Sequence, residues 1–158
     1  MNRKTTLLIL CAGLLTIFSC SEELKPTPYT FTKMFTGENN KTWRVKLFEE
    51  TLRDTVVSRS LPGCLVDDNF TFYANAEHRY EVKSGSRLCF EDEPALTTSN
   101  WTFSNSTATL TIIFPLLSDN ALPFFVREID EDDMEIEIFL DDENTESYRI
   151  HFSVTDEE

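Results

Sequence analysis

Alternation of apolar and polar residues recurs from residue 42 to the end of the chain, and its period of two is the period of a β-strand. No stretch shows an amphipathic helical pattern of convincing length. The residues predicted to face inward are Trp43, Val45, Leu47; Phe70, Phe72, Ala74; His78, Tyr80, Val82; Trp101, Phe103; Ala108, Leu110, Ile112, Phe114; Met134, Ile136, Ile138, Leu140; and Tyr148, Ile150, Phe152, Val154. A chain of this pattern is built from strands with one apolar face each.

Short polar segments separate these runs, among them YANAEH, SNST, DEDD and DDENTE. Their Asn, Asp and Ser side chains hydrogen-bond nearby backbone, which favours turns, and short turns join antiparallel neighbours. With no helices to cover them, the apolar faces are buried only if the sheet curls on itself. The sequence therefore predicts an all-β fold, an antiparallel up-and-down meander of about eight strands closing into a barrel. Residues 49–62 fit either a strand pair or a helical turn, and we expect an extended excursion there.

Residues 1–19 have the form of a secretory signal, with two cations near the start, an apolar run from Leu7 to Phe18, and Ser19 before the cut. The run is too short for a membrane span. The sequence Ile-Phe-Ser-Cys at its end resembles a bacterial lipobox, which implies cleavage before Cys20 and acyl chains on its thiol. Two or more acyl chains anchor a protein stably to a membrane. The alternative is an ordinary signal peptide that contains a cysteine by chance.

Ser21-Glu22-Glu23 resembles the acidic export tag of lipoproteins in the Bacteroidota. The resemblance implies an outer-membrane lipoprotein exposed at the cell surface, with the periplasmic face as the alternative. Residues 20–40 show no sustained period and are predicted to be a lipidated tether, followed by the barrel domain at 41–158.

The chain is strongly acidic, and its formal net charge is −14. Cleavage after Ser19 removes Arg3 and Lys4 and no acid, which changes the net charge to −16. Nucleic acid is not an expected partner, because its phosphates need Lys and Arg for neutralisation. The acidity favours solubility, with divalent cations as candidate surface partners, and we expect no cofactor.

Four cysteines are present, but they do not form one set. Cys11 lies in the signal and Cys20 is the predicted lipid site, so Cys64 and Cys89 remain in an oxidising compartment with no other partner. A disulfide between them is predicted, and its contribution would be on the order of 3 kcal/mol. A metal site is the alternative, although two cysteines without a nearby histidine pair do not supply four ligands.

The segments FTGENNKTWRV, CLVDDNFTF, YEVKSGSRLC and NWTFS occur in this order along the chain. Together they resemble the lipocalin-like domain of Bacteroidota lipoproteins. The matching positions are Lys41-Thr42-Trp43, Cys64, Asp67-Asp68, Thr71-Phe72, Cys89 and Trp101. The resemblance covers roughly residues 35–155, and it departs from the family at Asn75-Ala76, where Asp-Gly is usual. It implies an up-and-down barrel that binds a small apolar ligand.

The aromatic side chains of the inner face are the candidate ligand contacts. We expect such a ligand to touch Trp43, Phe72, Tyr80, Trp101, Phe114 and Tyr148. The alternative is that these rings fill a small barrel completely, which eight strands permit.

Other polar features have plainer interpretations. The clusters Asp67-Asp68-Asn69, Asp130–Asp133 and Asp141–Glu143 are interpreted as turns, because none has a calcium-loop spacing, and no metal site is expected. His78 is predicted to point inward and His151 outward, and neither belongs to a recognisable catalytic motif. Thr55, in Asp-Thr-Val, matches the short pattern of bacterial O-glycosylation.

The leading hypothesis is a lipid-anchored envelope lipoprotein, not an enzyme, whose barrel binds a small apolar ligand. The alternative is a non-enzymatic interaction module with a filled barrel, such as an accessory subunit of an envelope complex. An enzyme is the third option, and a polar cluster around His78 would favour it.

Overall fold

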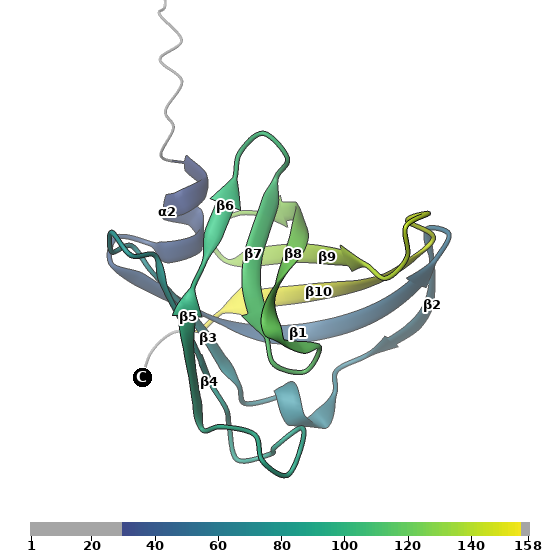
Figure 1. Ribbon diagram of the computed structural model, residues 1–158, viewed down its shortest axis with the longest axis horizontal. Helices are drawn as coiled ribbons and strands as arrows, with labels where there is room; N and C mark the ends of the chain where they lie inside the picture. The colour runs from purple at the N-terminus through teal and green to yellow at the C-terminus, as the bar shows by residue number, and fades with distance from the viewer. Residues whose placement is uncertain (1–29, 156–158) are drawn as a thin grey trace, which may run out of the picture.

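The computed structural model describes residues 30–155, which form ten β-strands in one curled sheet, a short α-helix and a 3₁₀ turn (Figure 1). The helix α2 is Thr30–Thr36, and the 3₁₀ turn η2 is Gly63–Leu65. The strands are β1 (Asn40–Leu52), β2 (Thr55–Ser60), β3 (Asn69–Tyr73), β4 (Arg79–Lys83), β5 (Leu96–Asn100), β6 (Thr102–Ser104), β7 (Thr109–Phe114), β8 (Ser118–Ile129), β9 (Asp133–Phe139) and β10 (Glu146–Val154). Within the described part of the chain, no helix is long and apolar enough to span a membrane.

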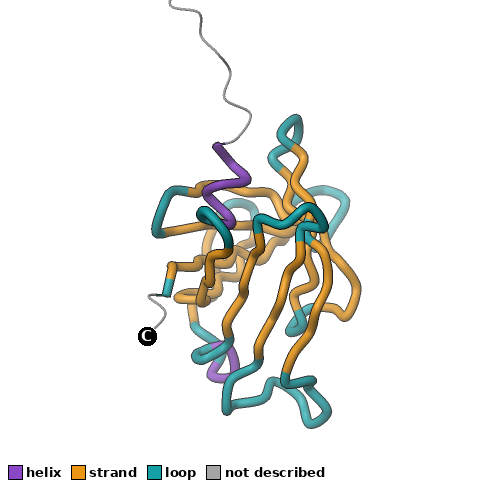
Figure 2. The backbone as a smooth tube through the Cα atoms, turned by 90° about the vertical axis from the view of Figure 1, so that its left-hand side faces the viewer, coloured by secondary structure: helices purple, strands orange, loops and turns teal. Residues whose placement is uncertain are grey.

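All strand pairs are antiparallel, and the order across the sheet is β5-β4-β3-β1-β10-β9-β8-β7-β6. Only Trp101 separates β5 from β6, so this stretch acts as one bent strand that pairs first with β4 and then with β7. The sheet thereby nearly closes into a barrel (Figure 2). The predicted all-β, up-and-down barrel is confirmed. With β5 and β6 taken as one strand and β2 left aside, the barrel has the eight strands expected.

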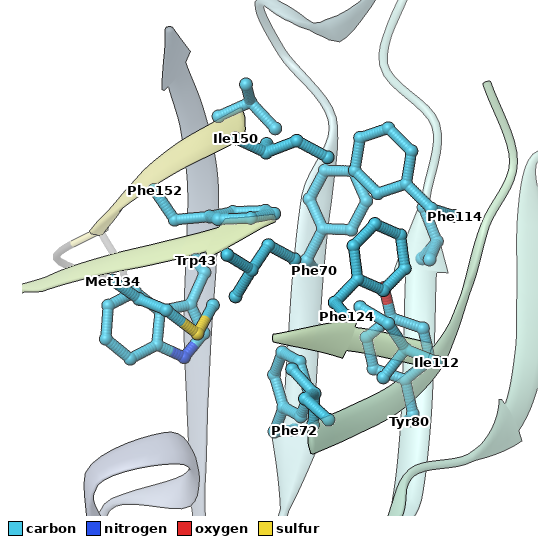
Figure 3. Packing of buried hydrophobic residues seen from close by; sticks show 14 of the residues in the cluster. Trp43, Phe70, Phe72, Tyr80, Ile112, Phe114, Phe124, Met134, Ile150 and Phe152 are labelled. Atoms are coloured by element: carbon cyan, nitrogen blue, oxygen red, sulfur yellow. The ribbon is translucent and has the colours of Figure 1, made fainter. Parts of the chain in front are cut away.

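The apolar faces of the strands meet inside the barrel, where aromatic rings from distant parts of the sheet contact one another (Figure 3). The buried core consists of Phe35, Trp43, Val45, Phe48, Leu65, Phe70, Phe72, Tyr80, Val82, Trp101, Leu110, Ile112, Phe114, Phe124, Met134, Ile136, Ile150 and Phe152. Most of these positions belong to the inward sets predicted from the alternation. The described residues thus contain one complete core.

The first strand departs from strict alternation. The register of β1 against β10 shifts between Val45 and Leu47, which marks a β-bulge. A bulge adds one residue to a strand and moves the following side chains to the opposite face. Phe48 is buried as a result, and Leu47, which was predicted to face inward, is only half-buried.

Two predicted inward residues lie in turns instead. His78 and Ala108 have positive φ angles of 51° and 50°, and both side chains are exposed. These residues reverse the chain before β4 and β7, so the strand alternation does not extend to them. Ala74 and Leu140, at the far ends of their runs, are also exposed.

The ambiguous segment 49–62 forms the end of β1, a tight turn and β2. The turn residues Arg53 and Asp54 both have positive φ angles, 50° and 59°, as in the hairpin turns that match strand twist. Leu52 pairs with Thr55 across this turn. The strand-pair alternative is therefore correct, and β2 pairs with the second half of β1, beyond the point where β3 ends.

The expectation of a tether is wrong for its last part, residues 30–40. Helix α2 packs on the barrel, where the ring of Phe35 is fully buried against Phe72 and Trp101, with centroid distances of 6.0 and 5.8 Å. A seven-residue helix has little stability of its own, so this contact holds it. The predicted signal, Cys20 and the residues beside it lie outside the described residues.

Candidate binding surfaces of the barrel

The six predicted ligand contacts all belong to the barrel, and most of them contribute to its packed core. Five of them, all except Tyr148, are completely or almost completely buried. Tyr148 is half-buried and packs on Phe48, with ring centroids 5.0 Å apart. The structure therefore brings five of the six together in the core.

The rings of the core contact one another directly. Phe72 lies 4.8 Å from Tyr80 and 6.0 Å from Trp101 between ring centroids. A second group centres on Phe114, which stacks on Phe70 at 5.3 Å. Four surface grooves on residues 30–155 are lined by other residues and not by these five. This arrangement matches a barrel filled by its own side chains.

Two of the polar groups on these rings are hydrogen-bonded, and one is not. The indole N–H of Trp43 donates to the carbonyl of Phe35 at 3.0 Å, and that of Trp101 donates to the carbonyl of Tyr73 at 3.2 Å. The hydroxyl of Tyr80 is buried and has no hydrogen-bond partner among the described residues. Burial raises the pKa of Tyr80 well above its usual value, so this phenol remains protonated.

The predicted disulfide is present between Cys64 and Cys89, whose Cα atoms are 4.9 Å apart. Two carboxylates accept hydrogen bonds from backbone N–H groups near this bridge. Asp68 accepts a 2.7 Å hydrogen bond from the backbone N–H of Gly85, and Glu93 accepts one of 2.5 Å from that of Cys89. The bridge and these bonds together fix the loop between β4 and β5.

Asp68 is a buried carboxyl, 2% exposed, near two other acids. Burial raises its pKa to about 6, and the negative charges of Glu93 and Asp67 act in the same direction, while the Gly85 N–H opposes them. Asp67, by contrast, accepts bonds from the backbone and hydroxyl of Ser86, which lower its pKa.

The acidic clusters predicted to be turns serve as turn caps. Asp130 accepts backbone N–H bonds from Asp132 and Asp133, and Asp141 accepts one from Thr145. Among residues 30–155, no group of three His, Cys, Asp or Glu side chains is arranged to hold a metal ion.

The two histidines lie on different parts of the fold and contact different residues. The ring of His78 stacks on Trp101 at the surface, with centroids 4.5 Å apart. His151 lies on the outer face of β10, as predicted, where its Nε2 is 3.2 Å from Glu49 and its Nδ1 is 3.4 Å from Glu135. Thr55, the candidate glycosylation residue, is exposed at the start of β2.

A buried carboxylate organises the outer face of β9 and β10. Glu137 is 1% exposed and contacts Arg127, Arg149 and Ser147. Burial alone would raise its pKa, but these hydrogen bonds and positive charges outweigh burial and hold the pKa below the usual range. The Glu137 carboxylate is thus neutralised by two arginines, which fits a structural role.

A groove of about 780 Å³ crosses the outer face of β1, β3 and β4. Its walls carry three cations, Arg44, Lys46 and Lys83, and polar groups that include Asn69 and Thr71. The alternation of β1 places Arg44 and Lys46 opposite the inward Trp43 and Val45, but it does not predict the groove. Lys83 joins them only through the pairing of β3 with β4, which the alternation of one strand does not reveal.

Comparison of the chain with models of protein families gave no match, and comparison with curated proteins gave none either.

Proposed function

We propose that this protein is a lipid-anchored lipoprotein of the bacterial outer membrane, exposed at the cell surface, whose barrel acts as a non-enzymatic interaction module. The observation that carries this proposal is the filled interior, in which Phe72, Tyr80 and Trp101 contact one another. A filled core leaves the outer face of the barrel for recognition. The acidic residues after Cys20 support the surface location.

The anchor is tested by replacing its cysteine. Cys20→Ala should move the protein from the membrane fraction to the soluble fraction of the cell envelope, because no acyl chain can be attached. Cys11→Ala is the matched control, since it removes the other cysteine of the amino-terminal region, and it should leave the protein in the membrane fraction. Retention of the Cys20→Ala variant in the membrane would contradict the proposal.

The surface location has its own test. Protease added to intact cells should digest the protein, and Glu22→Gln with Glu23→Gln should protect it by leaving it on the periplasmic face. Digestion of this double variant at the unchanged rate would show that the two acids do not direct export.

A small apolar ligand inside the barrel is the second candidate function, and the unpartnered hydroxyl of Tyr80 favours it. A buried hydroxyl without a partner is unfavourable, and a ligand with one acceptor atom would satisfy it. Binding would require the rings around Phe72 to move apart. Native mass spectrometry of the chain from Ser21 onward, incubated with a lipid extract of its host, separates the two functions. The mass of the protein alone would support the interaction module with a filled barrel. A one-to-one adduct that is lost in Tyr80→Phe would support binding of an apolar ligand.

A further inference from the structure

We infer that the groove across β1, β3 and β4 binds a short acidic oligosaccharide, which contacts Arg44, Lys46 and Lys83 through its carboxylate or sulfate groups. The inference deepens the proposed function, because it names the ligand class of the outer face. It rests on the charge, spacing and chemistry of the groove.

The three cations of the groove lie together, and carboxylates do not neutralise them. The sequence has 28 acidic and 14 basic residues, and Arg59, Arg79, Arg127 and Arg149 each contact a carboxylate. Within residues 30–155, Arg44, Lys46 and Lys83 belong to no ion pair. Unpaired cations gathered in one groove favour an anionic ligand.

The strand register sets the spacing of these cations. Asn69 pairs with Lys83 across β3 and β4, and its side-chain oxygen accepts a 2.8 Å bond from Arg44 on β1. Neighbouring strands are about 4.8 Å apart, so the backbones at Arg44 and Lys83 are separated by about 10 Å. Lys46 lies two residues beyond Arg44, about 7 Å along the strand. Three charges at this spacing suit a ligand with repeated anionic groups better than one phosphate, which needs donors converging on one point.

Between the cations, the groove presents neutral polar groups. The half-buried Thr71 hydroxyl lies 2.9 Å from that of the buried Thr42, and Asn69 precedes Thr71 on β3. Leu96 and Val154 add apolar surface to the lining. Hydroxyl and amide groups can bond sugar hydroxyls, and the apolar surface can contact the C–H face of a sugar ring. One acidic residue, Glu81, lines the groove. Its carboxylate already accepts a hydrogen bond from the hydroxyl of Tyr73 and pairs with Arg79. The combination favours an acidic carbohydrate over an acidic peptide.

The test is a titration of the chain from Ser21 onward, which includes the complete described core, with oligogalacturonate at low ionic strength. Neutral dextran oligosaccharide and polyglutamate are the comparison probes. Oligogalacturonate should bind, and added salt should weaken this binding, because salt screens exposed charges. Dextran should not bind, and polyglutamate should bind more weakly than oligogalacturonate. Equal binding of polyglutamate would overturn the carbohydrate assignment in favour of an acidic peptide.

Two variants locate the binding site. Lys46→Gln with Lys83→Gln should weaken oligogalacturonate binding about tenfold, or about threefold for each exposed charge pair lost. Both side chains are exposed, so the thermal midpoint should stay unchanged and show that the variant is folded. Arg53→Gln is the matched control, since it removes one charge from an exposed residue outside the groove and should leave binding unchanged.

Failure of this inference is distinguishable from failure of the proposed function. Absence of oligogalacturonate binding, or equal weakening by Arg53→Gln and by the double variant, would overturn the groove assignment. Neither result would alter the membrane fractionation of Cys20→Ala or the native mass of the filled barrel, which test the anchor and the interior.

Discussion

The indole N–H of Trp43 donates a 3.0 Å hydrogen bond to the carbonyl oxygen of Phe35, and this bond joins helix α2 to the first strand of the barrel. The Phe35 ring enters the same core as Trp43 and is fully buried. The helix is thus part of the folded domain, and its contribution to stability can be measured.

Phe35→Ala should lower the free energy of unfolding by about 3–5 kcal/mol, the usual cost of removing a buried phenylalanine ring. Phe31→Ala is the matched control on the same helix, because Phe31 is 44% exposed, and we expect a loss of about 1 kcal/mol or less. Urea unfolding followed by tryptophan fluorescence measures both. Equal losses would show that α2 does not depend on the buried ring.

A methyl group at Gly85 would overlap the carboxylate of Asp67, whereas one at Gly63 would meet open space. Gly85→Ala should therefore lower the free energy of unfolding by about 1–3 kcal/mol, because the Asp67 carboxylate must move and lose its bonds to Ser86. Gly63→Ala should change it by about 0.5 kcal/mol or less. Thermal unfolding of the two variants gives the comparison, and a stable Gly85→Ala protein would contradict this packing.

The raised pKa of Asp68 predicts a pH-dependent stability. Between the ordinary value of 3.8 and about 6, the folded state holds a proton on Asp68 that the unfolded state has lost. The contribution of Asp68 to stability therefore falls as the pH rises through this window, by at most about 3 kcal/mol. Asp68→Asn keeps an oxygen for the Gly85 N–H and removes the titration.

Between pH 4 and pH 7, the wild type should therefore lose stability relative to Asp68→Asn as the pH rises. Comparing the two proteins cancels the titration of the other carboxyls, several of which have lowered pKa values and act in the opposite direction. Urea unfolding at a series of pH values measures the difference. A difference independent of pH would contradict the raised pKa.

The disulfide closes a loop between residues 25 apart in sequence. Replacing Cys64 and Cys89 together with serine should lower the free energy of unfolding by about 3 kcal/mol, since the unfolded chain gains the freedom of the open loop. Differential scanning calorimetry of this double variant would measure the loss. An unchanged midpoint would mean that the carboxylate bonds around the loop hold it without the bridge.

The sequence predicted the strands and core well where one strand face meets the interior, as with Phe70 and Phe72 or Leu110 and Ile112. It failed where a local event changes the register of the side chains. The bulge after Val45 and the positive φ angles at His78 and Ala108 depend on backbone geometry, which the period-two pattern does not encode.

Helix α2 was missed for a different reason. Its seven residues are too few for a clear helical period, and its stability comes from the contact of Phe35 with the barrel. The candidate site shows the same limit, because the outward position of Arg44 follows from one strand, but its proximity to Lys83 requires the order of three strands. The cysteine pair needed no such information, since Cys64 and Cys89 were the cysteines left to pair.

The pairing of β1 with β10 joins residues from opposite ends of the described chain, such as Trp43 and Val154. The first strand therefore lacks its partner on one side until the last strand has been synthesised. Contacts so distant in sequence form slowly, because the intervening loop must close before they stabilise anything. The barrel therefore closes only after the last strand, β10, has been made.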